Sequence, residues 1–480
     1  MRKHSKTIFL LLVFSLLLCN SPIVLSATYY IDYVDGKDSN KGTSKSIPWK
    51  HCPGMQGFTG HYSHVAGDKF VFKGGVVWPS TVMPLILANS GSSDSCDLTN
   101  NIATCDQYTV DSTWYSGSSW SQPTFDGSGI KAGIYGKAGK SEYLIINNLK
   151  LINFGSYAGK DSVAAITLIK PNHTEIKNNY IESRCKICIQ LADSSFENTS
   201  NILVHDNIIK NCFKQLTFDG GGKTIYKINS FKIYNNLFQG NTFYLGGQAH
   251  SNIIHIYSDS TSEPFTFTNL KIYNNVISGH YPYGFTAQIY LERAAQSAYI
   301  YNNVLAFDNS VGSGCSGKNY CNGIEFRYGG RVYIYNNTIA SYGTNISNNL
   351  AQGTAIVASP IYCEYKGNII YGTKSIGQHC ECRKCVSDYN LIYPSSGKIG
   401  TTSKGIQKTT WTDWQASGYD THGINADPSF NSFSDFQLQA NSPARNAFPI
   451  EQTPRDIFTT DLSGITRPDS SAWDIGALQR

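Results

Sequence analysis

The stretch Tyr333–Ile339 (YIYNNTI) recurs in variant form along most of the chain. Each copy has a short apolar run, a pair of polar residues that is usually Asn-Asn, and a second apolar run. Counted at the second residue of the pair, the copies fall at Asn148, Asn179, Asn207, Asn236, Asn275, Asn303, Asn337, Asn368 and Asn390. Neighbouring copies are 22 to 39 residues apart, a spacing that is typical of solenoid proteins.

The chemistry of the repeat indicates which solenoid forms. Its apolar runs are rich in β-branched and aromatic residues, which favour strands, and they lack the spacing of an amphipathic helix. Asn accommodates the left-handed backbone of a sharp corner, and stacked Asn side chains can bond to one another from coil to coil. The repeat therefore predicts an all-β protein, a right-handed parallel β-helix, with the second Asn residues in one file. The right-handed form is expected because parallel strands strongly prefer right-handed crossovers.

The amino terminus has the pattern of a secretory signal peptide. Arg2, Lys3 and Lys6 precede the apolar run Ile8–Leu18, and Val24–Ala27 forms a cleavage region, so residues 1–27 are the predicted signal peptide. The eleven-residue apolar run is too short to span a bilayer. We therefore expect a secreted, extracellular monomer without membrane insertion. Removing three basic residues lowers the net charge from +5 to about +2, which argues against nucleic acid as a partner.

Three regions follow the signal peptide. Residues 28–140 are predicted to form an amino-terminal segment and early coils with loop insertions, and residues 141–395 the regular coils. Residues 396–480 are predicted to form a linker and a carboxy-terminal cap, because an uncapped solenoid would expose a strand edge and a bare core.

Of the thirteen cysteines, twelve remain once Cys19 leaves with the signal peptide, an even number suited to disulfides in an oxidising compartment. Their positions relative to the repeat predict two bridges between adjacent coils, since stacked strands lie about 4.8 Å apart. The predicted pairs are Cys363–Cys385 and Cys185–Cys212 between coils, with Cys96–Cys105 and Cys315–Cys321 within loops. A zinc site at Cys363, Cys380, Cys382 and Cys385 is the alternative.

A second strand in each of four coils places ionisable side chains on one outward face. With Leu216, Ile254, Ile289 and Ile324 pointing inward, strand alternation predicts two outward columns. The first column contains Thr217, His255, Tyr290 and Glu325, and the second contains Asp219, Tyr257, Glu292 and Arg327. Stacked strands would gather them in a patch about 15 Å tall. The preceding coil adds Cys188 and Gln190, and the following coil offers small residues around Val357 and Ser359.

Clustered groups of mixed acid–base character are what polysaccharide chemistry requires. A purely structural interpretation stands beside this one. Glu292 and Arg327 would then form a cross-strand ion pair, and His255 and the tyrosines would pack across strands. His250 and His280, in neighbouring loops, are weaker candidates for the site.

Motifs at both ends of the mature chain resemble those of a known superfamily. The first are Gly36–Thr43 (GKDSNKGT) and Pro48-Trp49, and the last are Asp461–Pro468 (DLSGITRP) and Asp474–Ala477 (DIGA). Together with the repeats, they resemble secreted right-handed β-helix proteins of the pectate-lyase-like superfamily over nearly the whole mature chain. The resemblance implies the fold but leaves the activity open, because the superfamily includes lyases, hydrolases, epimerases and inert scaffolds.

The segment Asn322–Gly329 (NGIEFRYG) resembles the N-G-x-E-x-x-R-x-G motif of β-helix alginate and chondroitin lyases, with one residue fewer between Glu325 and Arg327. In those lyases the Glu helps to hold calcium and the Arg assists catalysis. The resemblance therefore implies calcium as the cofactor, with Glu325 as a metal ligand, and we expect Glu292 as a second ligand beside it. The family's catalytic Lys could not be placed in this sequence.

We expect the patch to cleave an acidic polysaccharide by β-elimination. That reaction needs a base near the C5 proton, a proton donor for the leaving oxygen, and a cation near the substrate carboxylate. His255 or Tyr290 would be the base or acid, and Arg327, or calcium held by Glu292 and Glu325, would neutralise the carboxylate. Asp219 and Tyr257 would help to bind the substrate.

Two alternatives stay open. An inverting glycoside hydrolase, or an epimerase, could use the same scaffold, and the hydrolase would need two carboxylates several ångströms apart, from among Asp219, Glu292 and Glu325. A non-catalytic carbohydrate-binding or surface scaffold protein would need the tyrosines alone.

Overall fold

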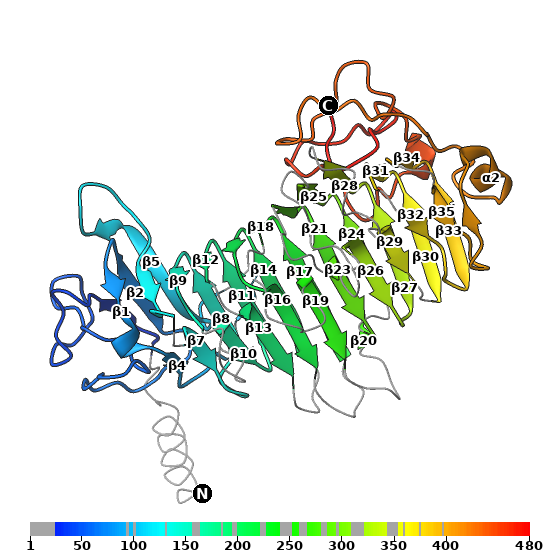
Figure 1. Cartoon of the computed structure of the whole chain (residues 1–480). Coiled ribbons are helices and arrows are strands. Elements are labelled where there is room, and N and C mark those ends of the chain that lie inside the picture. The colour runs from blue at the N-terminus through cyan, green and yellow to red at the C-terminus, as the bar shows by residue number, and fades with distance from the viewer. Residues whose placement is uncertain are drawn as a thin grey trace, which may run out of the picture.

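The computed structural model is a right-handed parallel β-helix, as predicted (Figure 1). It describes residues 25–92, 96–98, 102–129, 132–155, 164–183, 186–193, 199–220, 227–240, 252–258, 266–279, 286–293, 297–308, 321–342, 354–358, 361–373, 376–395 and 398–480. Three long sheets run along the molecule, and each regular coil contributes one strand to each of them. We name them sheet A, sheet B and sheet C.

Sheet A contains the strands that precede the Asn-Asn corners. Its order is β1 (Thr28–Ile31), β2 (Lys69–Gly74), β5 (Asp106–Tyr115), β8 (Glu142–Asn147), β11 (Asn172–Lys177), β14 (Thr199–His205), β17 (Lys227–Tyr234), β21 (Leu270–Tyr273), β24 (Ser297–Tyr301), β27 (Arg331–Tyr335), β30 (Tyr362–Lys366) and β33 (Lys384–Asp388), with β20 (Thr266–Phe267) paired to β17.

Sheet B contains the strands that follow these corners. Its order is β3 (Val77–Trp78), β6 (Thr124–Asp126), β9 (Lys150–Ile152), β12 (Tyr180–Glu182), β15 (Ile208–Lys210), β18 (Leu237–Gln239), β22 (Val276–Ser278), β25 (Val304–Asp308), β28 (Thr338–Tyr342), β31 (Ile369–Tyr371) and β34 (Leu391–Tyr393).

Sheet C completes each coil and carries the predicted patch. Its strands are β4 (Leu85–Leu87), β7 (Ile134–Gly136), β10 (Ala164–Ile169), β13 (Ile187–Asp193), β16 (Lys214–Gly220), β19 (Asn252–Ser258), β23 (Ala287–Glu292), β26 (Asn322–Arg327), β29 (Thr354–Ala358), β32 (Ile376–His379), β35 (Gly400–Thr401) and β36 (Gln407–Lys408). Only β36 is antiparallel to its neighbour among the strands paired in this sheet. The described helices are η1 (Ser80–Val82), α2 (Trp411–Ala416) and η2 (Ile450–Gln452).

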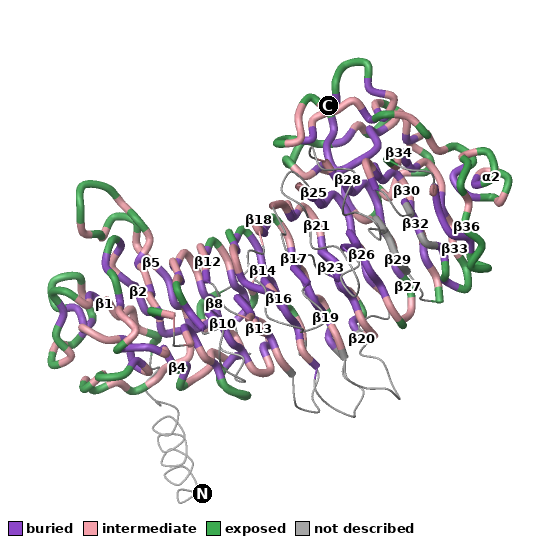
Figure 2. The backbone as a smooth tube through the Cα atoms, viewed as in Figure 1, coloured by how far each residue is buried: buried purple, intermediate pink, exposed green. Residues whose placement is uncertain are grey.

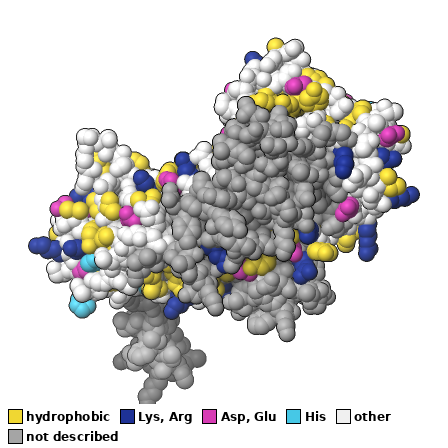
Figure 3. Space-filling model, viewed as in Figure 1, with side chains coloured by type: hydrophobic (Ala, Val, Ile, Leu, Met, Phe, Trp, Pro, Cys, Tyr) yellow, Lys and Arg dark blue, Asp and Glu magenta, His cyan; other side chains and the backbone are white. Residues whose placement is uncertain are grey.

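The inward faces of the three sheets meet in one continuous apolar core, which appears as buried strands in Figure 2. The four residues predicted to point inward on sheet C are fully buried there: Leu216, Ile254, Ile289 and Ile324. All four belong to the main apolar core, as the alternation used to predict the two outward columns requires. On the face shown in Figure 3, basic and acidic side chains are interspersed over the described surface. None of the described helices is long and apolar enough to cross a membrane.

The two residues of each Asn-Asn corner have different tasks. The first takes a left-handed backbone conformation, as at Asn178, Asn235 and Asn336, where φ is 55°, 53° and 47°. The second is buried, and its side-chain amide bonds to the equivalent Asn of the next coil. Asn236 Nδ2, for example, donates to Asn275 Oδ1 at 3.0 Å and to the Val204 carbonyl of the preceding coil at 2.9 Å. The file of second residues is therefore a hydrogen-bonded ladder.

The ladder confirms the predicted file for eight of the nine marked residues, from Asn179 to Asn390. The remaining marked residue, Asn148, is displaced by one position from the ladder. Sheet A pairs Asn147 with Lys177, so Asn148 takes the left-handed position (φ 63°) and Leu149 stands where the ladder residue would be. The Leu149 backbone amide donates to Asn179 Oδ1 and begins the ladder.

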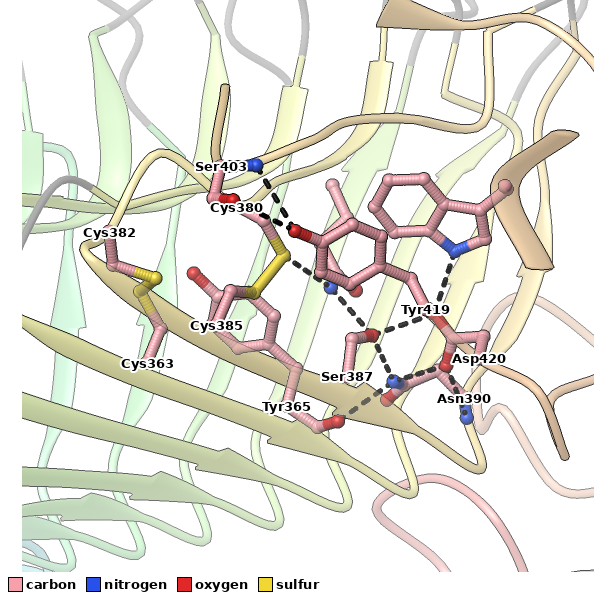
Figure 4. The surroundings of a disulfide bond; sticks show 12 residues. Cys363, Tyr365, Cys380, Cys382, Cys385, Ser387, Asn390, Ser403, Tyr419 and Asp420 are labelled. Carbon is pink, nitrogen blue, oxygen red and sulfur yellow. Dashed lines mark hydrogen bonds between the residues drawn. A yellow bond between two sulfur atoms is a disulfide. The ribbon is translucent and has the colours of Figure 1, made fainter. Parts of the chain in front are cut away.

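At the other end the ladder closes on a carboxylate, as Figure 4 shows. Asn390 Nδ2 donates to Asp420 Oδ1 at 2.8 Å, and Asp420 also accepts from Ser387 Oγ and Trp414 Nε1. Burial raises the pKa of Asp420, and these donors oppose the rise. The last rung thus joins the coils to the segment that carries α2.

One of the four predicted disulfides is confirmed. Cys96 and Cys105 are bonded, but Cys212 pairs with Cys188 instead of Cys185, and Cys363 pairs with Cys382 while Cys380 pairs with Cys385. Cys363 and Cys385 are neighbours in register, as predicted. Stacked residues of a parallel sheet lie about 4.8 Å apart, however, and a disulfide needs closer Cβ atoms, so each bonds to a cysteine outside the two strands (Figure 4).

These pairings also bear on the other cysteine predictions. The four cysteines of the zinc alternative are all in disulfides and are not thiolate ligands. Cys321 is disulfide-bonded, while Cys185 and Cys315 lie outside the described residues.

The carboxy-terminal segment covers two parts of the solenoid. The helix α2 places Trp414 in the core at the end of the last coil. The chain beyond it lies along the Asn corners of several coils, at the upper right of Figure 1. Asn302 Nδ2 donates to the Thr460 carbonyl, Asn336 Nδ2 donates to the Asp474 carbonyl, and the Gly476 amide donates to the Gly367 carbonyl.

Candidate active site on sheet C

The strand register contains the two predicted columns, which run across β16, β19, β23 and β26. These strands are neighbours in sheet C (Figure 1). In the first column, Thr217 pairs with His255, His255 with Tyr290, and Tyr290 with Glu325. In the second, Asp219 pairs with Tyr257, Tyr257 with Glu292, and Glu292 with Arg327. We call the following seven residues the acid–base patch: Asp219, His255, Tyr257, Tyr290, Glu292, Glu325 and Arg327.

The first column is not exposed, contrary to the prediction of two solvent-facing columns. His255 is 4% exposed, Tyr290 1% and Glu325 0%. Neighbouring side chains cover them in part: Tyr257 stacks on His255 with ring centroids 4.6 Å apart, and the Arg327 guanidinium lies over the Tyr290 ring. The second column is half-buried, so its side chains are the ones that a substrate would meet first.

A lysine that the sequence analysis missed joins the patch. Lys214, the first residue of β16, places Nζ 3.2 Å from His255 Nδ1 and 5.7 Å from the centre of the Tyr257 ring. Burial, with a smaller effect from Lys186, lowers the pKa of Lys214 to about 8, although Asp219 and Glu292 act in the opposite direction. The Lys214 amine is therefore close to its titration point at neutral to mildly alkaline pH.

Glu325 and Arg327 form an ion pair whose two members differ in exposure. Arg327 Nε contacts Glu325 Oε1, and Asn322 Nδ2 donates to Glu325 Oε2 at 2.8 Å. The Arg327 side chain is 40% exposed, whereas that of Glu325 is fully buried. Burial raises the pKa of Glu325, and the donors Asn322 and Arg327 limit that rise. The cross-strand pair predicted for Arg327 was with Glu292, but the pair that forms lies within β26.

Tyr290 links the two columns. Its ring stacks on His255 with centroids 5.0 Å apart. Burial raises its pKa, and the nearby carboxylates of Glu325 and Glu292 raise it further. Tyr290 therefore keeps its proton at neutral pH and acts as a hydrogen-bond donor. A base at this position would have to be another group.

The calcium ligands implied by the resemblance do not fit these surroundings. Both oxygens of Glu325 are engaged, one by the Arg327 cation and the other by Asn322. Among the described residues, no three His, Cys, Asp or Glu side chains converge as metal ligands. Calcium favours six or more oxygen ligands, and Glu292 and Glu325 do not supply such a set.

The neighbouring coils differ from the prediction in two details. Gln190 pairs with Thr217 and so continues the first column, whereas Cys188 is buried in the core and bonded to Cys212. Val357 pairs with Glu325 in β29 and follows the column, as expected. His250, His280 and Ser359 lie outside the described residues.

Comparisons with known proteins assign no family. No family model matches the chain, and no curated protein matches it. Two solved structures of the GH136 lacto-N-biosidase from Eubacterium ramulus match 77% of this chain and 64% of their own. The native protein has 10% identity and a TM-score of 0.39, and the selenomethionine derivative has 11% and 0.34. The chain thus spans less than two thirds of these structures, and membership of the pectate-lyase-like superfamily is not confirmed.

Proposed function

We propose that this chain is a carbohydrate-active enzyme that hydrolyses glycosidic bonds, with the acid–base patch as its active site. The observation that carries the proposal is the placement of Asp219 and Glu292. Both are half-buried, both belong to the second column, and they are separated by the single strand β19. The proposal favours the hydrolase alternative over the lyase.

The spacing of these two carboxylates suits an inverting hydrolase. Two steps between parallel strands separate their backbone positions by about 9.5 Å. Inverting enzymes hold their two carboxyl groups about 6.5–9.5 Å apart, so that a water molecule fits between one of them and the sugar. Asp219 and Glu292 would share the roles of acid and base. Both carboxylates also act on the Lys214 ammonium, where they oppose the fall of its pKa.

The other patch residues would position the substrate and the carboxylates. Tyr257 lies in the second column between Asp219 and Glu292, where its half-buried ring can contact a sugar. Tyr290 keeps its phenol proton and would orient the Glu292 carboxylate through a hydrogen bond. Rigid strands would hold all these groups at fixed spacing, so that little reorganisation is needed in the transition state.

Turnover of a panel of neutral and acidic polysaccharides tests the proposal. We expect new reducing ends without ultraviolet absorbance, and a loss of rate of about 10²–10⁴-fold in Asp219→Asn and in Glu292→Gln. Gln190→Ala, on the neighbouring strand β13 of the same sheet, is the matched control and should retain its rate. Turnover that survives in both carboxylate variants would exclude the assignment. Binding without turnover would favour the non-catalytic alternative.

Elimination from a uronic acid is the second candidate, and the lowered pKa of Lys214 favours it. An amine with a pKa of about 8 can accept the C5 proton near neutral pH, and Arg327 can neutralise the substrate carboxylate. The unsaturated product of elimination absorbs in the ultraviolet. Absorbance that appears with wild type and disappears with Lys214→Met would establish this reaction in place of hydrolysis.

A further inference from the structure

A buried carboxylate lies next to the first described residues of the chain. The backbone nitrogen of Ala27 donates to Asp68 Oδ1 at 2.8 Å, and the Lys69 amide donates to the Ala27 carbonyl at 2.9 Å. Ala27 thus extends the pairing of β1 with β2 by one residue. The Asp68 side chain is 0% exposed, so a charge on it is costly unless it is well compensated.

The other donors to Asp68 are neutral. Tyr62 Oη donates to Asp68 Oδ2 at 2.8 Å, and the Val65 amide donates to the same oxygen at 3.0 Å. No Lys, Arg or His side chain within the described ranges forms an ion pair with Asp68. A second buried carboxylate, Asp106, lies close by and has His64 Nε2 at 2.8 Å as its partner. Of the two neighbouring buried acids Asp68 and Asp106, only Asp106 therefore has a side-chain base as its partner in the described part of the chain.

The peptide bond before Ala27 has the features of a leader cleavage site. Leu25 is 79% exposed and Ser26 is exposed, so the bond is accessible. Leader peptidases require small residues at the first and third positions before the bond. Cleavage after Ala27, the boundary predicted from the sequence pattern, would place Leu25 at the third position, whereas cleavage one residue earlier places Ser26 and the smaller Val24 at these positions.

We propose that a leader peptidase cleaves between Ser26 and Ala27, and that the new α-ammonium of Ala27 forms an ion pair with the buried Asp68. Water supplies the hydroxyl of the new Ser26 carboxyl group and a proton to the Ala27 nitrogen. The nitrogen takes up a further proton from solvent and becomes cationic. Cleavage thus converts an existing hydrogen bond into an ion pair and fixes β1 on β2. This inference is independent of the proposed function.

The pair makes stability depend on pH in a defined direction. An α-amino group has an ordinary pKa of about 7.7–8.0, and pairing with Asp68 raises it in the folded state. Its stabilising effect is therefore complete below about pH 7.7 and is lost as the pH rises through the raised value. The titratable groups around the pair include Tyr29, Tyr62, His64, Lys69, Asp106 and Tyr108, and they are identical in the chains to be compared.

The test starts with the protein as it is secreted by its host or by a host with a leader peptidase. We expect its amino-terminal residue to be Ala27. Its thermal midpoint at pH 7 should exceed, by a few degrees, that of a chain with one extra glycine before Ala27. That chain keeps the Ala27 amide bond to Asp68 but moves the charge to an exposed position. The difference should vanish in an Asp68→Asn background and above about pH 10.

Two results would overturn the proposal. One is a different first residue in the secreted chain. The other is an equal thermal midpoint for the mature and glycine-extended chains at pH 7. This comparison keeps Asp68, so it remains decisive even where Asp68→Asn does not fold. Acetylation of the Ala27 amine provides an independent check, because it removes the charge without adding a residue, and it should lower the midpoint as the extra glycine does.

Discussion

The ion pair between Glu325 and Arg327 shows how one side chain can matter more than its own exposure suggests. Seen alone, Arg327 belongs to a surface pair of the kind that contributes little to stability. Its partner, however, is a fully buried carboxylate whose pKa burial has already raised. Removing the cation leaves that carboxylate uncompensated, so we do not expect a neutral substitution at Arg327.

We expect Arg327→Ala to lower the free energy of unfolding by about 2–4 kcal/mol, because removing one partner of a buried pair leaves the other charge uncompensated. Urea unfolding at pH 7 measures the loss. The deficit should shrink as the pH falls toward 4.5, since Glu325 can then take up a proton instead of remaining charged. The double variant with Glu325→Gln is the control and should recover most of the loss. An unchanged unfolding free energy in Arg327→Ala would show that the pair is energetically unimportant.

Lys214 leads to a stability prediction that does not depend on any substrate. Its pKa falls from 10.5 to about 8 on folding, mainly because it is buried. The folded state thus binds the proton more weakly, and this cost to stability is fully present below about pH 8 and disappears as the pH approaches 10.5. Lys214→Met removes the cost, so its stability relative to wild type should be greatest at pH 7 and smaller at pH 10. A constant difference between these pH values would contradict the burial of a titrating amine.

In the strands and corners, the Asn ladder carries much of the register. Each internal rung satisfies several buried groups at once. Asn275 Nδ2 contacts the Ile233 and Tyr273 carbonyls and Asn303 Oδ1, and Asn275 Oδ1 accepts from the Asn236 amide. The first corner residue, by contrast, is needed for its backbone conformation, and Asn235 is exposed.

We expect Asn275→Ala to cost about 2–5 kcal/mol of unfolding free energy, because it leaves several buried donors and acceptors without partners. Asn235→Gly is the matched control one coil earlier. Glycine adopts the left-handed conformation readily, so that change should be close to neutral. Chemical denaturation of the two variants gives the comparison, and equal losses would show that the corner conformation, and not the ladder, stabilises the coil.

Sequence patterns were sufficient for the repeating parts and failed where the repeat is broken. Strict alternation placed His255, Tyr290 and Glu325 in one column, since that part of each strand is regular. It missed Lys214, because alternation from Leu216 assigns the first residue of β16 to the inward side, whereas Lys214 Nζ lies 3.2 Å from His255 Nδ1. The burial of the first column could not be predicted either, because it depends on contacts between columns, such as Tyr257 on His255.

Across the whole molecule, the carboxy-terminal segment acts as a clamp over several coils, and Arg467 is its central contact. Its fully buried guanidinium donates to Asn302 Oδ1 at 2.9 Å and to the Gly476 carbonyl at 3.0 Å. Burial lowers its pKa to about 10, so it stays charged at neutral pH. The resemblance noted for Asp461–Pro468 and Asp474–Ala477 thus falls on residues that attach this segment to the coils.

We expect Arg467→Ala to free the carboxy-terminal segment before the coils unfold. Limited proteolysis should cut the variant within residues 425–480 and leave the remaining chain resistant. Arg455→Ala, which removes an exposed ion pair with Asp469 in the same segment, is the control and should resist like wild type. Global unfolding of Arg467→Ala without a protected fragment would show that the segment and the coils form one cooperative unit.

The Asn ladder also bears on how such a molecule can change its length during evolution. Every internal Asn of the ladder accepts a hydrogen bond from one neighbouring coil and donates one to the next. Duplication of one whole coil would therefore restore every hydrogen bond of the ladder. The two ends of the ladder cannot be duplicated in this way. Leu149 has no side-chain amide to accept a hydrogen bond, and the Asp420 carboxylate has no N–H group that could donate to a further coil. Descendants of this chain should therefore gain or lose coils in the interior, and outside β16–β26 wherever the patch is kept.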